Sequence, residues 1–135
     1  MDGVVDPDKI GMQGFCFGGG VTWRAVEQIP ELQGAAPYYG PPPPLGEVGA
    51  IKAAVLGVYS SDPSDFANEG RDELAAALTD AGVIFEINVY PGTQHAFNND
   101  TGSHYNETQA TAAWNDTLAW FEKHVLNSIL DEKSG

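Results

Sequence analysis

One segment near the N-terminus has the residue types and spacing of a reactive nucleophile. Gly14-Phe15-Cys16-Phe17-Gly18 matches the pattern Gly-x-nucleophile-x-Gly, which is typical of a sharp turn between a strand and a helix. Glycine is expected on both sides because such a tight turn leaves little space for side chains. The turn also puts Cys16 at a helix N-terminus, where the dipole and free N–H groups favour a thiolate. The pattern predicts Cys16 as a nucleophile and the Phe17 N–H as an oxyanion donor, against the alternative of a small buried apolar cysteine.

Candidates for an acid and a base follow two later apolar runs. Asp62 comes shortly after residues 53–59, and His95 comes shortly after residues 83–90. Parallel strands present their carboxyl ends at one edge of a sheet, so these side chains are expected to converge on Cys16. The chain order nucleophile, acid, histidine is one that catalytic triads use. We therefore expect His95 to act as general base and Asp62 to orient and stabilise its imidazolium.

Two alternatives for these roles can be weighed from the sequence. Asp65 is the other available acid, but its position suits the cap of a helix beginning near Phe66, and we favour Asp62. His104 and His124 are interpreted as a loop residue and a solvated helix residue. One cysteine and scattered histidines lack the spacing of metal ligands, and no phosphate-binding loop is present, so neither a metal nor another cofactor is expected.

The elements that must position these residues alternate along the chain. Strands are predicted at about 10–14, 35–39, 53–59 and 83–90, and helices at about 21–27, 66–81 and 107–126. Asn106 is the expected N-cap of the last helix, and Gln109 follows at capping-box spacing. The apolar face of this helix is expected in the core and consists of Ala110, Ala113, Trp114, Thr117, Leu118, Phe121 and Val125, which recur at helical spacing. Continuous apolar strands separated by helices predict an α/β fold with a parallel sheet covered on both faces.

Length and charge exclude several classes of function. The 135 residues are expected to form a single domain, residues 1–135, since domains of roughly 100–150 residues are common. A net charge of −13 argues against binding to nucleic acid or to an anionic membrane surface. The N-terminus does not read as a signal peptide, and the single cysteine gives no sign of an oxidising compartment. A cytoplasmic location is the resulting expectation.

The segment from Ile10 to Gly20 resembles the nucleophile region of dienelactone hydrolases. The resemblance continues through Tyr38-Tyr39-Gly40, the strand leading to Asp62, the run Tyr90-Pro91-Gly92-Thr93-Gln94-His95-Ala96-Phe97 and the final helix. It implies an α/β-hydrolase-like fold of about four mainly parallel strands, truncated relative to the family. It also implies hydrolysis of a small-molecule ester or lactone through an acyl-enzyme, with Cys16, Asp62 and His95 as the triad. The alternative is a non-catalytic binding or assembly module that retains a relic triad.

The resemblance covers only the C-terminal half of the family's domain, from the nucleophile turn onward. The family's second oxyanion donor and the glutamate that contacts the resting cysteine have no counterpart here. Its substrate-binding arginine after the histidine is replaced by Asn98-Asn99-Asp100. The strand between Ile10 and Gly14 would lack one neighbour, so we expect two copies to associate as a homodimer that covers this edge.

Overall fold

The described part of the chain is built on one parallel sheet. The structure is a computed structural model that describes residues 9–126. Its four strands are β1 (Gly11–Phe15), β2 (Gly34–Tyr38), β3 (Ala54–Ser60) and β4 (Phe85–Tyr90). They pair in the order β1-β2-β3-β4, and every pair is parallel. The predicted α/β class and the four-stranded sheet are confirmed.

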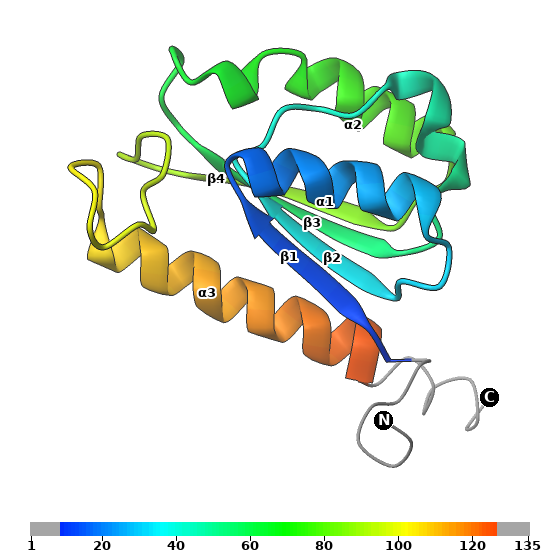
Figure 1. Cartoon of the computed structure of the whole chain (residues 1–135). Coiled ribbons are helices and arrows are strands. Elements are labelled where there is room, and N and C mark those ends of the chain that lie inside the picture. The colour runs from blue at the N-terminus through cyan, green and yellow to red at the C-terminus, as the bar shows by residue number, and fades with distance from the viewer. Residues whose placement is uncertain (1–8, 127–135) are drawn as a thin grey trace.

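Helices cover both faces of this sheet (Figure 1). The α-helices are α1 (Phe17–Gln28), α2 (Arg71–Asp80) and α3 (Glu107–Phe121), and α3 continues as a π-helical segment, Glu122–Leu126. Two short 3-10 helices span Leu45–Ala50 and Phe66–Asn68. Figure 1 shows α1 and α2 on one side of the sheet and α3 on the other.

Alternation along the buried strands supplies two separate cores. Ala35 and Val55 pack with Trp23 of α1 and Leu74 of α2 on one face. Their neighbours Ala36 and Leu56 belong to the second core, against which α3 packs on the opposite face. Strands β2 and β3 are buried along their whole length, as expected for interior strands of a parallel sheet.

The helix predicted at 66–81 is wrong in one respect, because the structure divides it. A 3-10 turn, Phe66–Asn68, is followed by Gly70 in the left-handed conformation (φ 77°), and α2 begins only at Arg71. A residue with positive φ cannot continue a right-handed helix, and glycine adopts it without a steric penalty. Gly82, with φ 74°, follows the end of α2.

The last helix is confirmed at its start and differs in its buried face. The Asn106 side chain accepts a hydrogen bond from the Gln109 N–H at 3.1 Å, as an N-cap should. Trp114 and Leu118, expected in the core, are 48% and 47% exposed. Thr117 is fully buried instead, and its hydroxyl lies 2.6 Å from the hydroxyl of Tyr38.

Both edge strands of the sheet, β1 and β4, have one neighbour each within residues 9–126. Strand β1 pairs with β2, and residues 9–126 supply no partner for its other side. Ile10, directly before β1, and Phe15, its last residue, are 38% and 45% exposed. None of the helices within residues 9–126 is both long and apolar enough to cross a membrane.

Candidate active site

Cys16 lies in a strained turn between β1 and α1. Its φ of 59° and ψ of −117° are unusual for a residue that carries a side chain. The Cys16 N–H donates to the Tyr38 carbonyl at 3.0 Å, and the Cys16 carbonyl accepts from Gly19 and Gly20 in the first turn of α1. These bonds hold the backbone in its strained conformation, and the Cys16 side chain is exposed.

The glycines around the turn are needed for reasons that the sequence pattern gives only in part. A Cβ on Gly14 would lie 2.1 Å from the Gly18 carbonyl oxygen, so Gly14 is required for close approach. A Cβ on Gly18 would meet nothing within 4 Å, and the expected lack of space at this position is wrong. The crowded position is Gly19, whose Cβ would lie 2.4 Å from the Tyr38 oxygen. There the start of α1 crosses the end of β2 without space for a side chain.

His95 connects the thiol to a buried carboxylate. Its Nε2 lies 3.0 Å from Cys16 Sγ, and its Nδ1 lies 2.9 Å from Asp65 Oδ1. The imidazole is flanked by the rings of Tyr39 and Phe66, each with its centroid 4.8 Å away. Cys16 and His95, which the sequence placed together, therefore meet at the carboxyl edge of the sheet.

The carboxylate against His95 belongs to Asp65, which corrects the expected choice of Asp62. Asp65 is 6% exposed, and its carboxylate also accepts from the Ser60 hydroxyl at 2.7 Å and from the Ala67 N–H at 2.9 Å. Asp65 therefore caps the 3-10 helix Phe66–Asn68, as predicted, while it also contacts the histidine. The two roles looked exclusive from the sequence, but one oxygen, Oδ1, serves both, while Oδ2 accepts from Ser60.

Asp62 faces away from this contact. Its carboxylate accepts from the N–H and the hydroxyl of Ser64 at 2.8 and 2.7 Å, and these bonds lower the pKa of Asp62. A tight turn follows β3, in which the Asp65 N–H donates to the Asp62 carbonyl at 3.1 Å. The turn points Asp65, three residues later, toward the interior.

Thr93 joins the loop that carries His95 to the loop that carries Asp65. Its hydroxyl donates to the Tyr90 carbonyl at 2.6 Å and accepts from the Ser61 N–H at 3.1 Å, while its own N–H donates to the Ser61 hydroxyl at 3.2 Å. Thr93 is buried. Thr93 was not predicted as a site residue, because its burial and its bonds to Ser61 leave no pattern in the sequence.

A hollow of about 500 Å³ opens beside the thiol, within the usual size of ligand pockets. It is lined by Phe15, Cys16, Tyr39, Ala96, Asn98, Asn99 and Asp100. The Tyr39 hydroxyl donates to the side-chain oxygen of Asn98, and burial raises the pKa of Tyr39, so this phenol stays neutral. The site thus combines a nucleophile, a base and a space for a small molecule.

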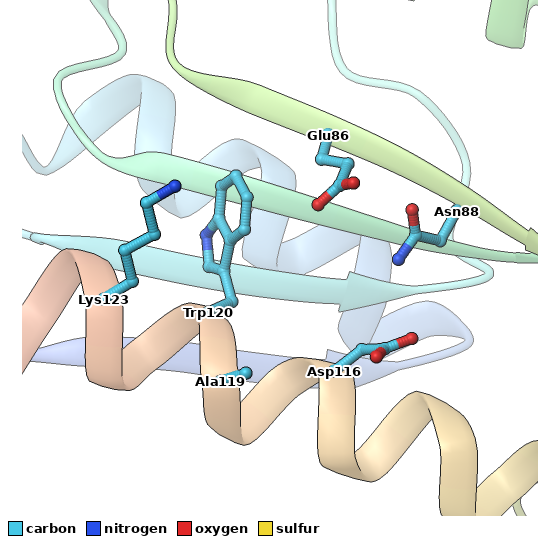
Figure 2. A pocket seen from close by; sticks show the side chains of 6 residues that line it. All are labelled: Glu86, Asn88, Asp116, Ala119, Trp120 and Lys123. Atoms are coloured by element: carbon cyan, nitrogen blue, oxygen red, sulfur yellow. The ribbon is translucent and has the colours of Figure 1, made fainter.

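A second hollow, of about 250 Å³, lies between β4 and α3 and contains no residue of the Cys16 site (Figure 2). Its lining residues are Glu86, Asn88, Asp116, Ala119, Trp120 and Lys123. Figure 2 shows Glu86 and Asn88 on the strand, facing the helical residues. The Asp116 carboxylate is already occupied by the Tyr90 hydroxyl at 2.7 Å. Within residues 9–126 no group of three or more His, Cys, Asp or Glu side chains is arranged to hold a metal ion.

Known proteins are similar to this chain in sequence and in fold. "Putative carboxymethylenebutenolidase" of Salmonella typhi is 33% identical over 129 residues, covering 88% of this chain and 48% of that protein. The protein of the same name from Saccharolobus solfataricus is 36% identical over 107 residues, covering 78% of this chain and 41% of that protein. The crystal structure named "Putative Dienelactone Hydrolase" from Klebsiella pneumoniae superposes with a TM-score of 0.81 at 32% identity, covering 88% of this chain and 54% of that one.

The chain thus spans about half the length of the curated relatives it matches. The model of the dienelactone hydrolase family matches residues 2–125, which is nearly the whole chain. The four parallel strands and flanking helices of this chain are those of the α/β-hydrolase fold, which the Klebsiella pneumoniae structure shares. The chain therefore belongs to the dienelactone hydrolase family.

Proposed function

We propose that this protein hydrolyses carboxylic esters or lactones through a thioester on Cys16. The observation that carries the proposal is the continuous contact from Cys16 Sγ through the His95 imidazole to the Asp65 carboxylate, at 3.0 and 2.9 Å. Family membership supports the same reaction class. In this proposal Asp65 takes the role that the sequence pattern gave to Asp62.

The chemistry begins with proton transfer from the thiol to the imidazole. With its own proton on Nδ1, His95 donates to Asp65 and accepts the thiol proton at Nε2. The thiolate then attacks the ester carbonyl carbon and forms a C–S bond. When the tetrahedral intermediate collapses, the C–O bond to the alcohol breaks and His95 returns the proton to the leaving oxygen. For a lactone the same step opens the ring, and the alcohol stays attached to the acyl group.

The second half of the reaction restores the thiol. Water attacks the thioester carbonyl while His95 takes one of its protons, and the C–S bond breaks to release the carboxylic acid. The proton then returns to the sulfur. Asp65 stays ionised throughout and stabilises the transient imidazolium.

The oxyanion that forms in each half needs a hydrogen-bond donor. Phe17 is the first residue of α1, and an N–H at that position has no acceptor within its own helix. Its N–H follows the nucleophile directly, which is the usual place of one oxyanion donor in this type of turn. We therefore keep the Phe17 N–H as the proposed donor.

The direct test is hydrolysis of p-nitrophenyl acetate by the wild type and by Cys16→Ala and His95→Asn. Each variant should lose at least about 10²-fold in kcat/KM, because neither thiolate formation nor attack can proceed. His124→Asn is the matched control, since His124 lies on the far end of α3 and is not part of the site. Equal rates in the wild type and Cys16→Ala would refute the proposal.

We also propose that two copies associate along the open edge of β1. Within the described chain the outer side of β1 is unpaired, and both Ile10 before it and Phe15 at its end are exposed, so this strand favours pairing with another strand. A two-fold axis would pair β1 with its copy and join the two sheets. Sedimentation should give a mass of twice 14.4 kDa. Ile10→Lys should lower the association constant, whereas Ile84→Lys, at an exposed position before β4, should not. A monomeric mass at micromolar concentration would overturn this proposal.

The predicted one-domain organisation of residues 1–135 and the cytoplasmic location remain proposals. The proposed location is supported by the single cysteine, which cannot form an internal disulfide and gives no sign of an oxidising compartment. Cell fractionation tests the location, and limited proteolysis tests the domain.

A further inference from the structure

We infer that the Cys16 site disfavours negatively charged substrates and accepts uncharged or positively charged esters, with Asp100 as the residue that determines this preference. The inference deepens the proposed function and rests on it. It comes from the side chains that line the hollow beside the thiol.

The lining carries negative charge and no positive charge. Around Cys16 stand the apolar and aromatic groups of Phe15, Tyr39 and Ala96, together with the neutral amides of Asn98 and Asn99. Asp100 is the one acidic residue among those that line this hollow, and it is exposed. Nothing in the lining could form an ion pair with a substrate carboxylate.

None of the lysines and arginines within residues 9–126 lines this hollow. Residues 9–126 contain Lys9, Arg24, Lys52, Arg71 and Lys123. Arg24 is paired with Glu27 and Glu47. The Arg71 guanidinium donates to Asn68 and stacks over Tyr59. Lys123 lines the separate hollow between β4 and α3.

The catalytic groups add to the negative charge. A Cys16 thiolate beside a protonated His95 is neutral as a pair, which leaves the charge of the Asp65 carboxylate uncompensated. Each tetrahedral intermediate then develops a further negative charge on oxygen. The chain as a whole carries −13, so a second anion on the substrate would be repelled both on approach and in the site.

The test measures the charge preference of the thiol without turnover. Cys16 is the single cysteine, so its reaction with methanethiosulfonates reports on this site alone. Two reagents are compared, the cationic trimethylammonioethyl and the anionic sulfonatoethyl methanethiosulfonate. The rate of each with Cys16 is divided by the rate of the same reagent with 2-mercaptoethanol, which removes its intrinsic reactivity. The cationic reagent should be favoured, and the preference should weaken as salt rises.

Asp100→Asn should reduce this cation-to-anion ratio by about two- to fivefold, the range of an exposed charge interaction. Asp80→Asn makes the same change in net charge at the end of α2, away from the hollow, and is the matched control. It should leave the ratio unchanged. An anion preference in the wild type, or an equal effect of the two variants, would overturn the inference.

The same variants with neutral p-nitrophenyl butyrate and anionic p-nitrophenyl hemisuccinate separate this inference from the proposed function. Asp100→Asn should raise the relative kcat/KM of the hemisuccinate by the same factor as the reagent ratio changes. If neither ester is hydrolysed and the reagents still show the charge preference, the proposed function fails while the charge selectivity of the site stands. If both esters are hydrolysed equally in all variants, the charge inference fails while the hydrolase function stands.

Discussion

Asp65 and His95, thirty residues apart, are joined by a contact of 2.9 Å between a carboxylate oxygen and Nδ1 of the imidazole. The carboxylate is buried and fixed from two further directions, by Ser60 at the end of β3 and by the N–H of Ala67. His95 in turn contacts the thiol through its other nitrogen. The orientation of the proposed base is therefore set by a buried carboxylate that Ser60 and Ala67 hold in place.

Replacing Asp65 by Asn should lower kcat/KM for p-nitrophenyl acetate by about 10²–10⁴-fold, because an amide neither fixes the tautomer of His95 nor stabilises its imidazolium. Asp62→Asn is the matched control and should stay within about threefold of wild type, since Asp62 bonds only to its own loop. The rate of Cys16 alkylation by iodoacetamide should follow the same pattern.

A larger loss in Asp62→Asn than in Asp65→Asn would contradict this assignment. Because Asp65 also caps a 3-10 turn, thermal unfolding of both variants is needed as well. We expect the Asp65→Asn variant to be folded and its Cys16 to be alkylated more slowly than in the wild type.

The choice between these two aspartates could not be predicted from the sequence pattern. The spacing of Cys16 and His95 after apolar runs could be predicted, because strand order fixes which chain segments reach one edge of the sheet. The choice of acid depended on the turn after β3, whose direction is set by the hydrogen bonds of Asp62 to Ser64. Such local bonds leave no periodic pattern in the sequence.

The helices show the same limit for burial. Helical periodicity correctly placed Ala113, Thr117 and Val125 on the buried side of the last helix. It also assigned Trp114 and Leu118 to the core, and both are about half exposed. Periodicity gives the apolar face of a helix but not its width, which depends on how far the sheet extends beneath it. Here α3 packs on the core formed by β2 and β3, and the side chains of Trp114 and Leu118 are not among the residues buried there.

Gly18 and Gly19 should respond very differently to alanine. Gly19→Ala should lower the free energy of unfolding by at least about 2 kcal/mol, because its Cβ would overlap the backbone at Tyr38. Gly18→Ala should be neutral or stabilising by up to about 1 kcal/mol, since its Cβ faces open space and alanine favours the helix. Urea unfolding of both variants measures the difference. Equal destabilisation would show that the crossing of α1 over β2 is not tight.

Thr93→Val should loosen the connection between the His95 and Asp65 loops. The variant keeps the side-chain shape but removes the buried bond to the Tyr90 carbonyl and the part-buried bond from the Ser61 N–H, at a cost of about 1–3 kcal/mol. We expect kcat to fall more than KM rises, because the base is misaligned while the hollow is unchanged. Thr93→Ser, which retains the hydroxyl, should restore most of kcat. Failure of serine to do so would assign the effect to the lost methyl group instead.

His124 should make the stability of the fold depend on pH near neutrality. Burial against α3 lowers the pKa of His124, helped by the adjacent Lys123 and opposed by Glu86, and the ring packs on Trp120 at 4.2 Å. The folded state therefore holds the neutral ring, and the unfolded chain takes up a proton first as the pH falls. The contribution of His124 is fully present above the ordinary histidine pKa of 6.5 and is lost progressively as the pH drops below it. In urea titrations, the stability difference between wild type and His124→Gln should be constant above pH 7 and should decrease toward pH 5. A difference that grows on acidification would mean that the folded protein favours the charged ring.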